Sequence, residues 1–344
     1  MGRKGTNRLR VAFSASSPRE TERRTGLDNY ARCLRHALRA AGVECADCAC
    51  LEGVAARPDV IHLLAPGLPP PLALGVPLIL TVHDLAWRRF PADYYPDAVR
   101  RFEQFLREWL PQVAAVIVPS TSTLREVAAW PGLKAPVYPV PMGVDTGLFR
   151  PNLPPPPATP TPYILNVASW VGRKNIPGLI RAFAGFARSR YGGDYSLVLA
   201  GEEIPGMPGK GREIRRAIAE DGLTEKVSLR GYVPDEELPG LYAGAGLLAF
   251  PSLEEGFGLP VLEAMACGVP VVTGNRSSLP EVVGDAGILI DPEDRRELAA
   301  GMAAVLHDGA LAAQLRRAGW ERARRFTWER TAQRTLEVYR SLLA

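Results

Sequence analysis

The sequence is poor in cysteine and histidine and holds no long hydrophobic run, and these shortages exclude several classes of protein. Five cysteines in 344 residues are too few for the disulfide framework of a small secreted protein. No apolar stretch approaches the roughly 18 residues of a membrane-spanning helix, and the N-terminus lacks the apolar core of a secretory signal. We therefore expect a cytoplasmic protein.

The charge is uneven along the chain. Residues 1–150 hold 19 Lys and Arg against 14 Asp and Glu, whereas the net charge of the whole chain is +4. The basic residues are scattered and no recognised nucleic-acid-binding module is present, so we expect no nucleic-acid partner. Two interpretations of the basic half stay open. It is a solvated surface, which is the more common case, or it contacts an acidic acceptor or the inner face of the cell membrane as a peripheral protein.

The length and the order of elements predict two domains of the α/β class. A chain of 344 residues exceeds the size at which one hydrophobic core usually suffices. Short apolar strands alternate with amphipathic helices, which is typical of parallel sheets covered by helices on both faces. The proline-rich residues 151–162 predict a stiff linker. We predict Rossmann-like domains over residues 1–150 and 163–326 and a C-terminal helix over 327–344.

Two carboxylates flank a glycine-rich turn that opens a short predicted helix. Glu255 precedes the turn, and Glu263 lies about one helical turn after Leu259 on the same face. Pro260 suits the first helical turn because the amide that it lacks would be unpaired there, and Gly268 supplies a left-handed cap. The unpaired amides at the helix start favour a diphosphate. Glu263 is expected to stay ionised and to accept two hydrogen bonds from a ribose diol.

Either glutamate alone has a plainer interpretation, in which Glu263 caps its helix and Glu255 is solvated. Two cations in another loop favour the ligand. Arg173 and Lys174 follow the first strand predicted in the second domain, where an ammonium and a guanidinium fork suit a diphosphate. The alternative is a basic helix start on the surface. No Asp-x-Asp motif for a divalent ion occurs, so we expect the leaving group to be stabilised without a metal.

No cofactor is predicted. Neither domain carries G-x-G-x-x-G after its first strand, and residues 206–211 lack the ending of a phosphate-binding P-loop. Cys45, Cys48 and Cys50 form a cluster that invites a zinc hypothesis, with Cys33 as the fourth ligand. Buried thiols in a strand are the more common interpretation of such a cluster.

Among the histidines, His83 is the strongest candidate for a functional role. It follows a predicted buried strand in T-V-H-D-L, so its ring can face a ligand and exchange a hydrogen bond with a sugar hydroxyl. His62 lies at the end of the strand D-V-I-H and is a weaker candidate. His36 and His307 lie on predicted helices and are interpreted as structural.

Residues 251–285 resemble the E-x7-E signature of retaining glycosyltransferases with the GT-B fold, specifically of family 4. The match includes E-G-F-G-L-P, E-A-M-A-C-G-V-P-V-V and S-L-P-E-V-V-G-D-A-G. The triplets R-K-N at residues 173–175 and H-D-L at 83–85 resemble a branch with many mannosyltransferases. The resemblance implies two Rossmann-like domains whose parallel sheets face each other across a cleft, with a C-terminal helix that crosses back to the first domain. A simple terminal helix of the second domain is the alternative.

Three groups of residues receive roles from this resemblance. The catalytic group, which neutralises the departing diphosphate and lies near the transferred sugar, is Arg173, Lys174, Glu255 and His83. The donor-binding group, which contacts the sugar, ribose, phosphates and nucleobase, is Glu263, Gly256, Phe257, Gly258, Leu259, Ser169, Tyr232 and Val233. The acceptor-side group is Gly26 and Asp84.

The resemblance implies transfer of a hexose, with retention of configuration, from a nucleotide-diphosphate sugar to a glycan or lipid-linked acceptor in polysaccharide biosynthesis. GDP-mannose is the favoured donor, and a UDP-linked glucose or N-acetylglucosamine is the alternative. Two other classes stay open, namely a catalytically silent sugar-nucleotide-binding protein and a glycoside hydrolase. The hydrolase would use paired carboxylates but would not need the two cations.

Overall fold

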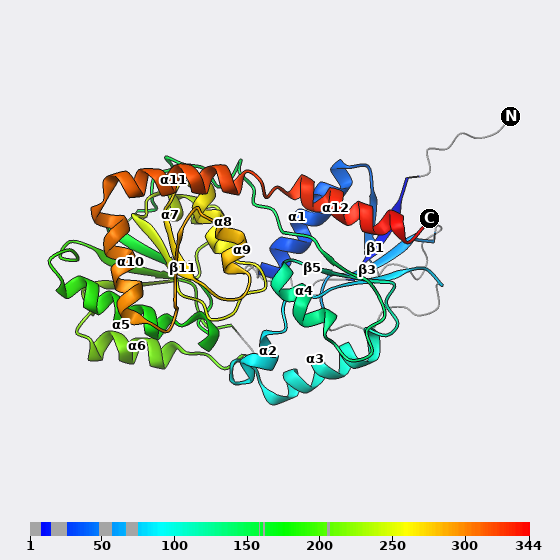
Figure 1. The fold of residues 1–344 in the computed structure, drawn as a ribbon, viewed down its shortest axis with the longest axis horizontal. Coiled ribbons are helices and arrows are strands. Elements are labelled where there is room, and N and C mark those ends of the chain that lie inside the picture. The colour runs from blue at the N-terminus through cyan, green and yellow to red at the C-terminus, as the bar shows by residue number, and fades with distance from the viewer. Residues whose placement is uncertain are drawn as a thin grey trace. The chain divides into compact units, whose positions relative to one another are not determined.

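The chain folds into two compact units, each built on a six-stranded parallel sheet (Figure 1). Unit 1 consists of Met1–Leu85, Arg100–Gly143 and Trp328–Ala344, and unit 2 consists of Ala86–Val99 and Val144–Thr327. The structure is a computed structural model that describes residues 8–14, 26–47, 57–66, 75–157, 159–160, 162–204 and 207–344. The predicted α/β class with two parallel sheets is confirmed.

The sheet of unit 1 has the strand order β2-β1-β3-β4-β5-β6. Its strands are β1 (Arg10–Phe13), β2 (Glu44–Asp47), β3 (Val60–Leu63), β4 (Leu78–Thr81), β5 (Ala115–Val118) and β6 (Val137–Pro139). The helices with residues in this unit are α1 (Gly26–Ala40), α3 (Pro96–Trp109), α4 (Thr121–Ala128) and α12 (Trp328–Ser341). Strands β3 and β5 are buried at every position, as expected for strands covered on both faces.

The C-terminal helix α12 packs beside α1 within unit 1 (Figure 1). At its start, the ring of Trp328 lies 6.0 Å from that of Tyr30, centroid to centroid. Near its end, the buried Tyr339 hydroxyl lies 2.7 Å from Nδ1 of His62 at the end of β3. The chain therefore returns to unit 1 after completing unit 2, which confirms the crossing predicted for this helix.

The sheet of unit 2 has the strand order β12-β11-β10-β7-β8-β9. Its strands are β7 (Tyr163–Val167), β8 (Ser196–Ala200), β9 (Val227–Gly231), β10 (Leu247–Phe250), β11 (Val271–Gly274) and β12 (Ile288–Ile290). Its helices after β7 are α5 (Ile176–Arg188), α6 (Gly211–Glu220), α7 (Leu238–Ala243), α8 (Leu259–Ala266), α9 (Leu279–Val283), α10 (Arg295–His307) and α11 (Gly309–Ala323). This is the Rossmann order, in which the direction of strand addition reverses between β7 and β10.

One segment of residues 1–150, which the sequence predicted as a single domain, belongs to unit 2. Ala86–Val99 holds α2 (Ala86–Arg89) and the 3-10 helix η3 (Pro91–Asp93), and it belongs to unit 2 by its contacts. The segment from Val144 onward also belongs to unit 2, where the Val144 amide donates a hydrogen bond to the Phe326 carbonyl oxygen at 3.0 Å. The segment Ala86–Val99 joins unit 2 because the side chains of Arg89 and Asp93 pair with groups of that unit.

Candidate functional site

Two predicted motifs meet where the strand order of unit 2 reverses. Strands β7 and β10 are adjacent and parallel, so their carboxyl ends lie at the same edge of the sheet. The loop after β7 carries Arg173 and Lys174, and the loop after β10 carries Glu255. Ligands of open parallel sheets bind at such a reversal, because the loops diverge there and leave a crevice. The structure thus joins residues that are 81 positions apart in the sequence.

The ammonium of Lys174 and the carboxylate of Glu255 form an ion pair at this edge. Their side chains are 11% and 10% exposed, so water screens the pair only weakly. The Lys174 ammonium also lies 5.4 Å from the centre of the Phe250 ring, which is a cation–π distance. A cation and a carboxylate are therefore held side by side in a largely water-shielded position.

A buried aspartate orients the turn that carries the two cations. This turn is the 3-10 helix η4 (Gly172–Lys174). Asp93 accepts a hydrogen bond from the Gly172 amide at 2.7 Å and another from the Arg173 amide at 2.8 Å, and it is 2% exposed. A Cβ atom on Gly172 would stand 2.5 Å from the Asp93 carboxylate, so this approach requires glycine. Asp93 was not predicted as a site residue, because nothing in P-A-D-Y marks it.

The loops after β7 and β10 are tied to each other. The carbonyl oxygen of Arg173 accepts hydrogen bonds from the Leu253 amide at 2.7 Å and from the Ser252 hydroxyl at 3.1 Å. The buried carboxylate of Glu254 pairs with the Arg89 guanidinium at 2.5 Å. Arg89 and Asp93 thus connect the segment Ala86–Val99 to both loops.

The turn after β11 supports the Glu255 loop. The Ser277 hydroxyl accepts a hydrogen bond from the Glu255 amide at 2.9 Å, and Ser277 itself adopts a left-handed φ of 52°. The fully buried Ser278 hydroxyl lies 2.9 Å from the Glu255 carbonyl oxygen and 2.7 Å from that of Phe257. Neither serine was predicted, although both lie inside the segment that carries the family resemblance.

Helix α8 begins and ends as its sequence predicts. Gly258 precedes it with a φ of 113°, which is accessible to glycine but strained for other residues. Pro260 lies in the first turn, and Gly268 follows the helix with a left-handed φ of 69°. Within the described part of the chain, no side chain caps the start of this helix. Pro260 has no N–H, and the Val261 and Leu262 amides donate to the Gly258 carbonyl oxygen at 3.1 and 3.3 Å. The capacity of this helix start to bind an anion therefore rests on the Leu259 amide and on the partial positive charge of the helix end.

Glu263 differs from its prediction in protonation. Burial raises the pKa of its carboxyl to about 7, although the Tyr242 hydroxyl donates a hydrogen bond to it at 2.9 Å and lowers that pKa. With this pKa the carboxyl is partly protonated near neutral pH, whereas the sequence analysis expected it to stay ionised. The physical reason is position: Glu263 is the fifth residue of α8, and the influence of the helix end falls off within the first turn.

His83 and its neighbours belong to unit 1. Nε2 of His83 donates a hydrogen bond to the Leu64 carbonyl oxygen at 2.9 Å, because a carbonyl can only accept. Burial lowers the pKa of this imidazole, so the ring is neutral and its Nδ1 is an acceptor. Asp84 follows it and is half-buried, and Gly26 is the exposed first residue of α1. His83 is thus able to accept a hydrogen bond from a hydroxyl.

His62 lies in the core of unit 1, where its ring is hydrogen-bonded on both sides. Nδ1 lies 2.7 Å from the Tyr339 hydroxyl and Nε2 lies 2.7 Å from the Thr81 hydroxyl. The side chain is fully buried, and burial lowers its pKa to about 3. Both ring nitrogens are therefore used inside unit 1, in agreement with the weaker functional prediction for this residue.

The other donor-side candidates lie in unit 2. Ser169 is half-buried in the loop after β7, and Tyr232 and Val233 are half-buried directly after β9. Phe257 is 4% exposed, with its ring 5.9 Å from that of Phe326. Its side chain therefore serves packing, and only its backbone can serve a ligand.

The sequence analysis predicted no metal ion and no membrane-spanning helix. In the described ranges, no group of three or more His, Cys, Asp and Glu is arranged to hold a metal ion. Cys33 and Cys45 are half-buried and not disulfide-bonded, while Cys48 and Cys50 lie outside those ranges. The absence of a metal site stays a prediction, with zinc at the cysteine cluster as its alternative. Over the same residues no single helix is long and apolar enough to cross a membrane, although one bent helix pair, Arg295–His307 with Gly309–Ser341, meets the criteria by length and composition.

Comparison with known proteins agrees with this geometry. Residues 154–322 match the family model "Glycosyl transferases group 1", and residues 13–148 match "Glycosyltransferase Family 4". The chain is 35% identical to O-antigen chain mannosyltransferase B of Escherichia coli over 77% of its own length and 70% of the relative's. It is 33% identical to the MMP alpha-(1->4)-mannosyltransferase of Mycolicibacterium hassiacum, over 83% and 71% of the two chains. The crystal structure of Anabaena HepE with UDP and glucose superimposes with a TM-score of 0.74 at 18% identity, over 97% of this chain and 100% of that one.

Proposed function

Because the chain belongs to the glycosyl transferases group 1 family and is a glycosyltransferase, we propose that it transfers a hexose from a nucleotide-diphosphate sugar with retention of configuration. The Lys174–Glu255 pair beside the uncapped start of α8 carries this proposal. A diphosphate needs cations and backbone amides, and a sugar needs a carboxylate that accepts hydrogen bonds from its hydroxyls. Both kinds of group are present at one edge of the unit 2 sheet.

The proposed donor is GDP-mannose. Two relatives that this chain covers over 70% or more of their length are named mannosyltransferases, which supports mannose as the transferred sugar. The acceptor is proposed to be a hydroxyl of a glycan or lipid-linked glycan, since one of these relatives acts on an O-antigen chain by its name. A UDP-sugar is the second candidate, because HepE holds UDP and glucose in a similar fold.

The proposed reaction needs no nucleophile from the protein. The bond between the anomeric carbon and the diphosphate oxygen breaks, and a bond to the acceptor hydroxyl oxygen forms on the same face of the sugar. The acceptor proton passes to a phosphate oxygen of the leaving nucleoside diphosphate. Lys174, Arg173 and the amides at the start of α8 stabilise the charge that develops on this leaving group, so no metal is required. Glu263 binds the ribose and Glu255 the transferred sugar.

Thermal unfolding with candidate ligands tests this proposal. A ligand that binds only the folded protein raises its melting temperature, and at 100 times its dissociation constant it adds about 2.7 kcal/mol. For a unit of 150–250 residues this corresponds to about 5–11 °C. We expect that shift with GDP and GDP-mannose, unchanged by EDTA. A shift with UDP compounds instead would identify the second candidate, and loss of the shift in EDTA would reject the metal-free site.

Product analysis separates the enzyme from a silent binding protein and tests retention. Release of GDP from GDP-mannose that depends on an acceptor, with an α-configured mannoside identified by NMR, is the expected result. Binding without turnover for every acceptor class would favour a silent binding protein. A β-configured product would reject retention.

A further inference from the structure

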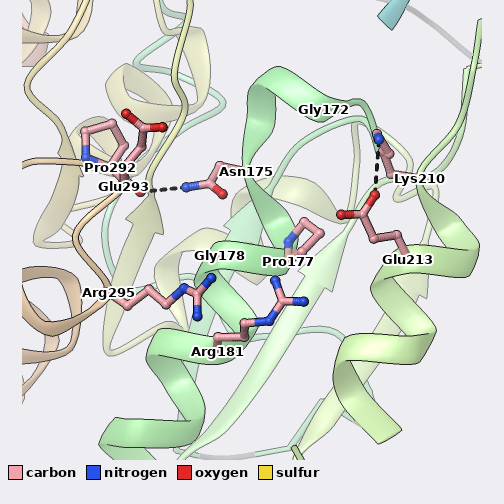
Figure 2. A pocket seen from close by; sticks show the side chains of 10 residues that line it. All are labelled: Gly172, Asn175, Pro177, Gly178, Arg181, Lys210, Glu213, Pro292, Glu293 and Arg295. Atoms are coloured by element: carbon pink, nitrogen blue, oxygen red, sulfur yellow. Dashed lines mark hydrogen bonds and ion pairs between the residues drawn. The ribbon is translucent and has the colours of Figure 1, made fainter. Parts of the chain in front are cut away.

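A polar pocket in unit 2 adjoins the turn with Arg173 and Lys174 but is lined by none of the residues assigned to the donor. Its volume is about 300 Å³, at the lower end of the range for small-molecule sites. It is lined by the first turns of α5 and α10 and by the start of α6 (Figure 2). Among the described residues that line it, Gly172 and Asn175 bracket the turn with Arg173 and Lys174, but neither of these cations lines it.

The two carboxylates of this pocket already have basic partners. Glu213 pairs with Lys210, with Nζ and Oε2 3.1 Å apart. Glu293 pairs with Arg276 at 2.7 Å. These carboxylates are therefore neutralised locally, and neither is needed as a counter-ion for the remaining cations of the pocket.

Two arginines supply the remaining charge. Arg181 comes from α5 and Arg295 from α10, and Figure 2 shows both guanidinium groups extending over the part of the pocket near Gly178. Within the described ranges, neither guanidinium has a carboxylate or a hydrogen-bond partner. Two like charges directed to one pocket repel each other, and an anion between them would remove this repulsion. Arg181 is half-buried and Arg295 is exposed, so water and salt weaken this repulsion while both groups stay accessible to an anion.

The backbone adds to the positive potential. Helix α5 is 13 residues long and starts at the pocket, and Asn175, which precedes it, makes no capping hydrogen bond with its side chain. The Asn175 amide group instead donates to the Pro292 carbonyl oxygen at 2.6 Å, which ties the start of α5 to the segment before α10. The helix end therefore presents a partial positive charge beside the two arginines.

We propose that this pocket binds a phosphate monoester, with Arg181 and Arg295 as the groups that hold the phosphate. Guanidinium forks match the oxygens of a phosphate and bind it in bidentate fashion. Glu213 and Glu293 accept hydrogen bonds from hydroxyls on the organic part of the ester. The same chemistry is offered by a soluble sugar or glycerol phosphate and by the headgroup of phosphatidic acid. The site goes beyond the proposed transfer reaction and does not depend on it.

Isothermal titration with inorganic phosphate and with glycerol 3-phosphate tests the site. The double variant Arg181→Ala/Arg295→Ala is expected to weaken phosphate binding by about 10-fold or more, because each substitution removes the charged hydrogen bonds from one guanidinium to the phosphate. The matched control is Arg188→Ala/Arg296→Ala, which removes the same charge from exposed positions on the same two helices. We expect the control to bind within twofold of the unchanged protein. Thermal unfolding of each variant verifies that it is folded.

Three results would overturn the proposal. They are no measurable binding, equal weakening in the control, or loss of binding in Lys174→Ala, which would place the phosphate in the donor site. Flotation with phosphatidic acid vesicles then identifies the source. Vesicle binding that requires Arg181 and Arg295 indicates a lipid headgroup, and its absence beside glycerol 3-phosphate binding indicates a soluble ester.

Discussion

Replacing Asp93 by Asn should impair the donor site, although Asp93 contacts the turn with Arg173 and Lys174 only through backbone amides. The carboxylate accepts hydrogen bonds from two amides, those of Gly172 and Arg173, at 2.7 and 2.8 Å. Asn has one acceptor oxygen, so its NH₂ group faces the second amide and that amide loses its bond. A hydrogen bond to a charged group contributes about 1.5–3 kcal/mol. At about 2–4 °C per kcal/mol for a unit of this size, the melting temperature should fall by about 3–12 °C.

The loss of activity should exceed what unfolding explains. Asp93 orients the turn that carries Arg173 and Lys174, and a misplacement of about 1 Å can cost about 100-fold in rate. We expect kcat/KM for the donor to fall by about 10- to 100-fold, measured well below the melting temperature of the variant. A folded Asp93→Asn protein with kcat/KM within twofold of the unchanged enzyme would refute the positioning role.

The control for this experiment comes from the same segment. Asp97 is exposed in the first turn of α3, and Asp97→Asn makes the same change of charge. A carboxylate at such a helix start contributes about 0.3–1 kcal/mol. We expect a small change in melting temperature and no change in kcat/KM.

Three further predictions follow from buried pairs. Lys174→Ala should lower kcat by about 100- to 1000-fold, as expected for removal of one group that stabilises a leaving anion, and it removes the cation that pairs with Glu255. Glu263 has a pKa raised from 4.5 to about 7, so the stability that its protonated form provides is present below about pH 4.5 and is lost as the pH rises through 7. Relative to Glu263→Gln, the free energy of unfolding should decrease by up to about 3 kcal/mol over that range. Tyr339→Phe should cost about 1–3 kcal/mol, because it leaves Nδ1 of buried His62 without a partner.

Each of these has a measurement that can contradict it. For Lys174, near-normal turnover in a steady-state assay would exclude the proposed role, and Lys134→Ala, at an exposed position of unit 1, serves as the control. For Glu263, denaturant titrations at several pH values should show the trend, and a constant difference between the two proteins would show that burial does not shift this pKa. For Tyr339, hydrogen exchange in α12 should become faster, and unchanged protection would show that the His62 contact contributes little.

Local signals in the sequence were sufficient for several features of this protein. The proline in the first turn of α8 and the glycine after its last residue predicted both helix ends, because these residues impose backbone angles regardless of the surroundings. The two parallel sheets were predicted from the alternation of short apolar strands with amphipathic helices, which is typical of sheets covered by helices on both faces. The motif of residues 251–285 was sufficient for the family.

Other features depend on contacts between distant parts of the chain. Asp93 lies 79 and 80 residues before the amides that it holds, and no local pattern in P-A-D-Y signals that partnership. The same contacts assign Ala86–Val99 to unit 2, which composition could not indicate. The raised pKa of Glu263 was missed for a similar reason: the helix end is visible in the sequence, but the burial that dominates this pKa is not.

The sequence by itself determined the α/β class, the ends of α8, the candidate cations and carboxylates, and the glycosyltransferase family. These features rest on backbone preferences and on motifs that are contiguous in the chain. Only the tertiary structure decided that Lys174 pairs with Glu255, that Asp93, Ser277 and Ser278 hold their loops, and that Arg181 and Arg295 line one pocket. Such pairings depend on which strand ends and helix starts become neighbours, and that follows from how the sheet of unit 2 is assembled from separated strands.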